Sequence, residues 1–292
     1  MKNLLRAFFL FLFIQIIFIT ALFGQNEKTI LWEITGKGLT KPSYLFGTIH
    51  IQDKRVFDLG PTITEKLESC DAFSMELLMD KISKEEITEV MLMKGKSLKD
   101  LYTPEEYEEL KILFKEKTGQ PLMLFDQMKP FFVASQVMQA SMSQDMPMAL
   151  DLHLLEIAKK AGKTTLGVEQ LKDQMGAVDK ITLEDQAKML LEALKDTTEQ
   201  SVGFEDLLVT YLSGDVDKMV ELSSDTSLPA EFNKYFLIKR NYGMAKTIAK
   251  FMKTKPTFSA IGAAHLGGKE GVLELLRKKG FTVTPVFFIR GE

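Results

Sequence analysis

The sequence has few of the residues that most often carry out chemistry. Its 292 residues include one cysteine, one tryptophan and three histidines. A single cysteine, Cys70, cannot form an internal disulfide. Because no histidine lies near it in the sequence, Cys70 is interpreted as a small packed residue rather than as a nucleophile.

An excess of positive charge is also missing. Lys and Arg number 37 against 40 Asp and Glu, which gives a formal net charge of −3. A protein that binds nucleic acid needs a basic face for the phosphates. The composition therefore argues against a nucleic-acid partner.

Long apolar runs are absent except at the N-terminus. There Lys2 and Arg6 precede an apolar run from Ala7 to Phe23, and the small residue Gly24 follows it. This order is typical of a secretory signal, so we expect residues 1–24 to be removed and the protein to be secreted or periplasmic. The run is near the lower limit for spanning a bilayer, so a retained N-terminal anchor is the alternative. No integral membrane domain is expected beyond it.

The remaining chain, residues 25–292, is predicted to be a single α/β domain. Residues 29–35 and 43–49 are rich in β-branched and aromatic residues and are expected to pair as a hairpin. Residues 81–161 and 182–252 have helical periodicity, and the strand-like sequence TTLGV lies between them. These two helical segments are expected to cover the sheet.

A repeated motif marks the two ends of this domain. SYLFGTIHI contains Gly47 and His50, and TFSAIGAAHL contains Gly262 and His265, so each strand-like run ends in G-x-x-H. A helix and another strand follow each copy, which predicts two βαβ units with parallel strands. The predicted fold is therefore α/β, with a mixed central sheet built from two similar halves and a large helical middle.

Polar residues follow four of the predicted strands. His50, Glu76, Glu169 and His265 each come just after a strand-like run. Because ligands of parallel sheets bind beyond the carboxyl ends of the strands, we expect these side chains to meet. Imidazole and carboxylate groups suit a divalent ion such as Mn, Co or Zn, which would activate water for hydrolysis. A carboxylate not bound to the metal could act as general base.

Other residues have two interpretations each. Glycine at 47 and 262 either provides a backbone conformation that other residues avoid or lets the backbone approach a ligand closely. Arg240 either binds an oxyanion or a substrate carboxylate, or is a solvated surface charge. His153 is interpreted as an ordinary helix histidine, and Asp151 as a charge favourable to the same helix dipole.

In these motifs the chain resembles the TraB/PrgY/GumN family, which includes the Tiki metalloproteases and is related to erythromycin esterases and ChaN-like proteins. The matching stretches include YLFGTIH, the glutamate at 76, MKP at 128–130, DLHLLEIAKKAGKTTLGVEQLKDQ at 151–174, KRNYGMAKTI at 239–248 and FSAIGAAHLGG at 258–268.

The resemblance implies a metal-dependent peptidase site. It places His50, His265 and Glu76 as metal ligands, and Glu76, Glu169 and Arg240 as catalytic candidates. The chain has Gln170 where many relatives have a threonine, so a hydroxyl that would orient Glu169 is lost.

The favoured interpretation is a secreted or periplasmic metal-dependent hydrolase whose substrate is a peptide or protein. Two alternatives stay open. One is a ChaN-like protein that binds haem or a peptide without cleaving it, and the other is a metal-independent esterase with a histidine as general base.

Overall fold

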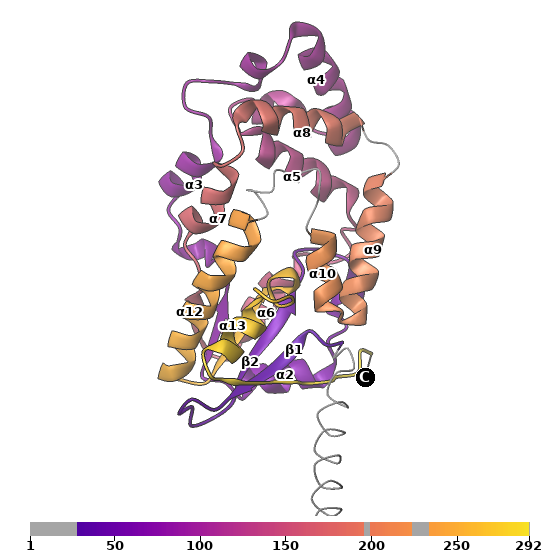
Figure 1. The fold of residues 1–292 in the computed structure, drawn as a ribbon. Coiled ribbons are helices and arrows are strands. Elements are labelled where there is room, and N and C mark those ends of the chain that lie inside the picture. The colour runs from indigo at the N-terminus through magenta and orange to yellow at the C-terminus, as the bar shows by residue number, and fades with distance from the viewer. Residues whose placement is uncertain (1–27, 196–198, 224–233, 292) are drawn as a thin grey trace, which may run out of the picture.

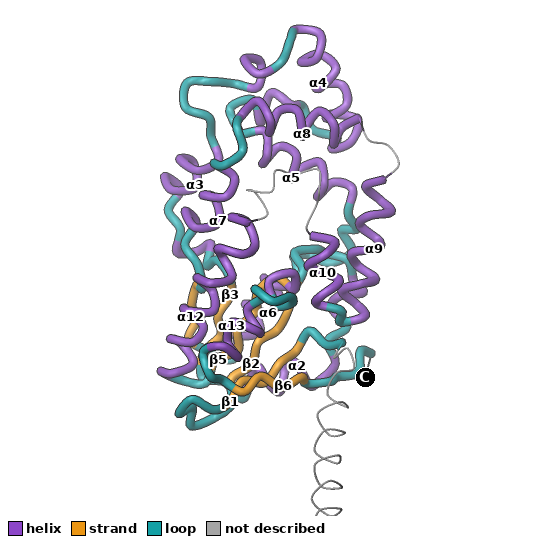
Figure 2. The backbone as a smooth tube through the Cα atoms, in the orientation of Figure 1, coloured by secondary structure: helices purple, strands orange, loops and turns teal. Residues whose placement is uncertain are grey.

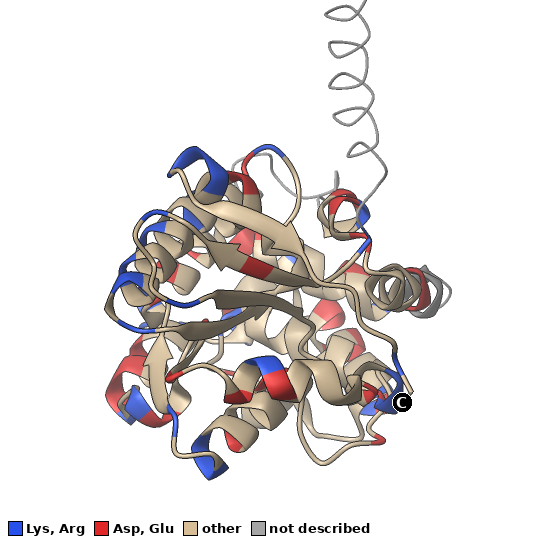
Figure 3. Cartoon of the chain, turned by 90° about the horizontal axis from the view of Figure 1, so that it is seen from below, with Lys and Arg blue, Asp and Glu red and all other residues tan. Residues whose placement is uncertain are grey.

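The computed structural model describes residues 28–195, 199–223 and 234–291. The segment predicted to be a signal, residues 1–24, therefore lies outside the described residues. Within them a six-stranded sheet has helices on both faces, and a further group of helices lies beyond one end of it (Figures 1 and 3). The strands are β1 (Leu31–Thr35), β2 (Ser43–Thr48), β3 (Ala72–Met75), β4 (Thr164–Gly167), β5 (Thr257–Gly262) and β6 (Thr282–Pro285).

The sheet is mixed, as the sequence predicts. Its strand order is β4-β3-β5-β2-β1-β6. β2, β5, β3 and β4 are parallel to their neighbours in this group, whereas β1 is antiparallel to both β2 and β6. The predicted hairpin of β1 and β2 is confirmed. The two strands that lead into the G-x-x-H motifs, β2 and β5, are direct neighbours, with Gly47 opposite Ile261.

The helices begin and end where local chemistry favours it. In α4 (Pro104–Thr118), the Thr103 side chain accepts a hydrogen bond from the Glu106 backbone, and the Glu106 side chain accepts one from Thr103. Pro104 occupies the first turn, and Gly119 ends the helix at a φ of 72°. These contacts satisfy backbone groups that a helix end leaves unpaired.

Several helices pack directly on the sheet. α6 (Leu150–Lys160) lies against β3, β4 and β5, and α13 (Val272–Lys278) lies against β6 and against α12 (Arg240–Thr254). A π-helical segment, Lys234–Lys239, leads into α12. The other helices are α2 (Gly60–Glu68), α3 (Lys84–Met91), α5 (Pro130–Ser141), α7 (Leu171–Val178), α8 (Leu183–Lys195), α9 (Glu199–Ser213) and α10 (Val216–Ser223).

The apolar residues form two separate cores. The larger one surrounds the sheet and contains Phe258, whose ring contacts those of Phe46 and Phe73. The smaller one lies between α4, α5 and α8 and contains Phe114 and Leu190. Figure 2 shows these helices gathered above the strands. The helical middle of the chain is therefore partly a layer with its own core.

Charged residues of both signs are interspersed around the sheet end of the molecule (Figure 3). Among the described helices, none is both long and apolar enough to cross a bilayer.

Candidate active site

The side chains predicted to meet at the ends of the strands do come together. Arg240 joins two of them, with its Nη2 atom 2.8 Å from Glu76 Oε2 and 2.7 Å from Glu169 Oε2. His265 Nε2 lies 3.9 Å from Glu76 Oε1. His50 is near enough for its charge to act on both Glu76 and His265. Because β2, β3, β4 and β5 run parallel, all four residues reach the same edge of the sheet.

Arg240 is buried, so its interpretation as a solvated surface charge is wrong. It is 6% exposed and stands at the start of α12. Its Nε atom donates to both oxygens of Glu169 at 3.1 Å, and Nη1 donates to the Phe236 carbonyl. With these donors engaged, the guanidinium is placed to hold the two carboxylates in position.

Glu76 is an ionised carboxylate with a partner on each oxygen. Oε1 accepts from the Gly262 backbone N–H at 2.7 Å, while Oε2 accepts from Arg240 and from Gln174 Nε2 at 2.8 Å. Burial by itself raises the pKa of Glu76, but the nearby His265 ring, the charges of His50 and Arg240 and the Gly262 N–H lower it to about 2. A carboxylate that ionises so readily suits a metal ligand better than a general base.

Glu169 differs from Glu76 in its electrostatic surroundings. Burial raises the pKa of Glu169, and the hydrogen bond and charge of Arg240 only partly offset this effect. Two carboxylates therefore share one guanidinium, and Glu169 is the one that depends on it more.

His265 is held by a residue that sequence reasoning did not assign. Its Nδ1 lies 2.6 Å from Asn241 Oδ1, and Asn241 Nδ2 donates to the Glu270 carbonyl at 2.9 Å. Because the amide nitrogen is used by Glu270, the amide oxygen faces the ring, and Nδ1 carries the donated proton. Nε2 then has a free lone pair directed toward Glu76. Burial lowers the pKa of His265 to about 4, which keeps the ring neutral.

His50 has a carboxylate partner that sequence reasoning also missed. Its Nδ1 forms an ion pair with Asp151 Oδ1 at 3.0 Å, although the His50 side chain is 56% exposed and that of Asp151 only 10%. Desolvation lowers the pKa of His50, but Asp151 and the charge of Glu76 raise it to about 9. Asp151 was predicted only to favour the helix dipole. Its burial at the start of α6 is explained better by this pairing.

The glycines of the two motifs serve close packing. Neither Gly47 nor Gly262 is among the described residues with positive φ, so the prediction of a special backbone conformation is wrong. A Cβ at Gly47 would lie 2.9 Å from Leu266 Cδ1, and one at Gly262 would lie 3.1 Å from Glu76 Oε1. The atoms that lie close to both glycines belong to the protein itself, so the other interpretation, a close approach to a ligand, stays a prediction.

Two residues predicted to lie outside the site are indeed placed elsewhere. The ring of His153 packs edge-on against Phe57, with ring centres 5.4 Å apart. Cys70 is a buried free thiol, and burial raises its pKa to about 11. Its expected packing role fits these surroundings.

The donor atoms at the site have the chemistry that a divalent cation requires. His265 Nε2 and Glu76 Oε1 are too far apart for a hydrogen bond, yet two bonds of about 2.0–2.2 Å to one ion could span their 3.9 Å separation. Glu76, Glu169 and Asp151 supply more negative charge than Arg240 neutralises. Across the described residues, however, no group of three or more His, Cys, Asp or Glu residues is already arranged to hold an ion. The structure thus presents two donors with the His50 imidazole nearby.

Comparison with known proteins gives one family. The model of the TraB/PrgY/gumN family matches residues 30–285. Metalloprotease TIKI2 of Danio rerio is 23% identical over 316 residues, covering 89% of this chain and 61% of that protein. TIKI2 of Xenopus tropicalis is 25% identical, covering 89% and 60%, and Metalloprotease TIKI1 of Homo sapiens is 26% identical, covering 89% and 62%. The chain thus spans about three fifths of the length of these relatives. No solved structure matches it.

Proposed function

The chain belongs to the TraB/PrgY/gumN family, and from this premise we propose that it is a metal-dependent hydrolase that cleaves peptide bonds. Its relatives named metalloproteases support this reaction class. The observation that carries the proposal is the surroundings of the two imidazoles. The Nδ1 of His265 contacts an amide oxygen and that of His50 a carboxylate, while Nε2 of His265 faces Glu76. Metal-binding histidines typically have their second nitrogen engaged in this way.

In the proposed site, His265, His50 and Glu76 hold a divalent ion such as Mn, Co or Zn. When bound, the ion would lower the pKa of a coordinated water toward about 7 and polarise the substrate carbonyl. Asn241 fixes the ring of His265, and Asp151 positions that of His50. The Gly262 N–H directs Glu76 Oε1 toward His265.

Arg240 and Glu169 act as positioning residues in this proposal. Arg240 binds Glu76 Oε2 and so leaves Oε1 to face His265. Glu169 accepts hydrogen bonds from the same guanidinium at both of its oxygens. We propose this role in place of direct contact with substrate, because both side chains are about 5% exposed and engaged with each other.

We also propose that the protein works outside the cytoplasm. The charged, apolar and small residues of the first 24 positions favour export and cleavage, with a retained anchor as the alternative. N-terminal sequencing of the exported protein distinguishes the two, because cleavage gives a new terminus near Gln25 and an anchor retains Met1.

A second candidate function is a metal-independent esterase. The pairing of His50 with Asp151 favours it, because a carboxylate that raises the basicity of an exposed imidazole is the arrangement of a general base. In that reaction the deprotonated imidazole of His50, which predominates above its pKa of about 9, would take a proton from water without help from a metal.

One experiment tests both candidates. The metal content of the purified chain is measured, and hydrolysis of short peptides and of simple esters is then followed with and without chelator. Stoichiometric metal and peptide cleavage that is lost with chelator and restored by Mn, Co or Zn support the hydrolase. Ester cleavage that survives complete metal removal refutes metal dependence and favours the esterase. A haem-loaded protein without turnover would refute both and support a binding protein.

A further inference from the structure

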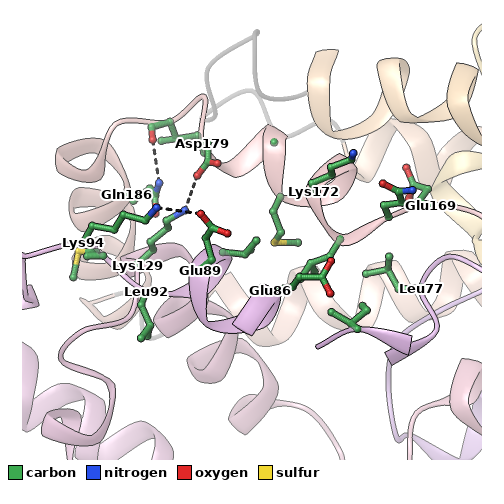
Figure 4. Close-up of a pocket in the computed structure, with 18 of the residues that line it drawn as sticks. Leu77, Glu86, Glu89, Leu92, Lys94, Lys129, Glu169, Lys172, Asp179 and Gln186 are labelled. Carbon is green, nitrogen blue, oxygen red and sulfur yellow. Dashed lines mark hydrogen bonds and ion pairs between the residues drawn. The ribbon is translucent and has the colours of Figure 1, made fainter. Parts of the chain in front are cut away.

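A large cavity adjoins the candidate site, and Glu169 is the one described residue of the site that lines it. Its volume is about 990 Å³. Glu169 and Leu77 lie at one end of it, and Lys129, Asp179 and Gln186 lie at the other (Figure 4). Lys129 belongs to the MKP stretch at 128–130, which has no role in the chemistry proposed above. The cavity is at the upper end of the range for ligand sites, so it has room for several residues of an extended chain.

The charges that line the cavity largely cancel one another. Lys129 Nζ pairs with Asp179 at 2.6 Å, and Lys94 Nζ pairs with Glu89 at 3.1 Å (Figure 4). Neither a strongly acidic nor a strongly basic ligand finds a matching field here.

Apolar side chains supply much of the rest of the lining, together with polar ones such as Gln170, Thr182 and Gln186. Leu78, Met93 and Ile181 are between 4% and 7% exposed, and Val90 and Met175 lie beside them as half-buried residues. Two of these five side chains are methionines, which adapt to ligands of different shapes. The cavity therefore suits apolar side chains of varied form.

The cavity adjoins the candidate site at one shared residue, and no other described residue of the site is in its lining. Glu169 lines it and also binds Arg240, which binds Glu76. Gly167, the last residue of β4, lines the same end, and β4 is an edge strand of the described sheet. A strand edge beside a cavity that is lined in part by apolar side chains is a common way to bind an extended peptide.

We propose that this cavity is the subsite that receives the apolar side chains of a peptide substrate lying on one side of the scissile bond. The inference rests on the proposed peptidase function and adds a preference for bulky apolar residues. A peptide is favoured over a small apolar molecule because the cavity is elongated and runs from Glu169 toward the helical layer.

The experiment fills part of the cavity with a new side chain, introduced at a position where it causes no clash. Gly176 lies in α7 and lines the cavity, and a Cβ there would meet no atom within 4 Å. Gly176→Leu therefore adds a side chain to open space, and leucine favours the helix more than glycine does. Gly203→Leu in α9 is the matched control, because a Cβ there also meets nothing within 4 Å and the position is outside the cavity. Thermal denaturation of both variants verifies that they fold.

Binding is measured first, so that the result does not depend on catalysis. Short fluorescein-labelled peptides carry a single Leu, Phe, Asp or Ser in an otherwise Ala and Gly chain, and fluorescence anisotropy gives their affinities for the metal-free protein. We expect the wild-type protein to bind the Leu and Phe peptides more tightly than the others. Gly176→Leu should lower the affinity for these two peptides by about tenfold or more and change the affinity for the Ser peptide little. Gly203→Leu should bind like the wild type. The same peptides are then assayed for kcat/KM with metal.

The outcomes separate the subsite from the proposed function. If the wild type prefers Leu and Phe peptides, Gly176→Leu loses this preference and no peptide is cleaved, the proposed peptidase function is refuted and the proposed subsite is supported. Cleavage that Gly176→Leu leaves unchanged for every peptide refutes the subsite and supports the peptidase. The subsite proposal is also overturned if the wild type binds no peptide, or if Gly176→Leu lowers the affinities for the Leu and Ser peptides equally.

Discussion

The buried ion cluster makes a quantitative prediction about Arg240. Replacing it by methionine keeps much of the volume of the side chain but leaves Glu169 and Glu76 buried without their cation. Removing one partner of a buried ion pair costs about 3–5 kcal/mol, because the remaining charge keeps its desolvation penalty. Domains of this kind are stable by about 5–15 kcal/mol, so Arg240→Met should still fold but with a much lower free energy of unfolding.

The assay is urea denaturation followed by circular dichroism, in excess chelator so that bound metal does not contribute. Arg277→Met is the control, because Arg277 pairs with Glu274 at 3.9 Å and both side chains are more than a third exposed. Arg277 also lies over the Trp32 ring and donates to the Val283 carbonyl, so this variant should cost about 1–2 kcal/mol, still less than Arg240→Met. The double variant Arg240→Met with Glu169→Gln should recover about 1–3 kcal/mol of the loss, because one unpaired charge is gone.

The loss should also depend on pH in a defined direction. In the wild type, Glu76 has a folded pKa of about 2, below its ordinary value of 4.5. Its contribution to stability is therefore present above pH 4.5 and is lost as the pH falls toward 2. Without Arg240, the burial that already raises the pKa of Glu169 is no longer offset, so this pKa moves further above its unfolded value and the variant gains relative stability as the pH falls. The difference between the two proteins should be largest near pH 7 and should narrow toward pH 5.

Two results would refute this reasoning. If Arg240→Met costs no more than Arg277→Met, the guanidinium is not compensating for buried charge. If the double variant is less stable than Arg240→Met alone, the unpaired Glu169 carboxylate is not the source of the loss.

The proposed site makes three further predictions. His50→Ala and His265→Ala should each abolish metal retention measured by mass spectrometry, and the double variant should be no worse, because residues that act as a unit are not additive. His153→Ala should retain full metal, and an equal loss there would contradict the shared site. Asn241→Ala should weaken metal affinity by about 10–100-fold in a calorimetric titration, because it releases the ring of a ligand; unchanged affinity would argue against that orientation. Gly47→Ala should lower the free energy of unfolding by about 1–3 kcal/mol, because its methyl group would lie 2.9 Å from a leucine carbon; unchanged stability would show that the packing relaxes freely.

Much of this architecture can be predicted from the sequence because local signals agree with the fold. The strands follow β-branched and aromatic runs, and α4 begins at Thr103 and Pro104 as its capping residues require. The meeting of His50, Glu76, Glu169 and His265 follows from one rule, since the carboxyl ends of parallel strands share one edge of the sheet.

The partners of those residues cannot be predicted in the same way. Asp151, Gln174 and Asn241 each lie on a helix, and their contacts with the site depend on how that helix packs against the sheet. A helix that is amphipathic in sequence shows which face is buried, but it does not show which polar residue reaches a strand end. Asp151 offered one signal in hindsight, because it is an acidic residue at a position whose neighbours Leu150, Leu154 and Leu155 are all core residues.

The two copies of the G-x-x-H motif differ in structure although their residue patterns match. The reason is that the two copies pack against each other. β2 and β5 are neighbours, so the first glycine, Gly47, packs against Ala263 and Leu266 of the second copy. The second glycine, Gly262, instead packs against Glu76 and donates its N–H to that carboxylate. One glycine therefore brings the two motifs together, and the other brings the acidic residue to the second histidine. A sequence repeat alone indicates two equivalent turns, whereas side-by-side packing requires each glycine to serve a different neighbour.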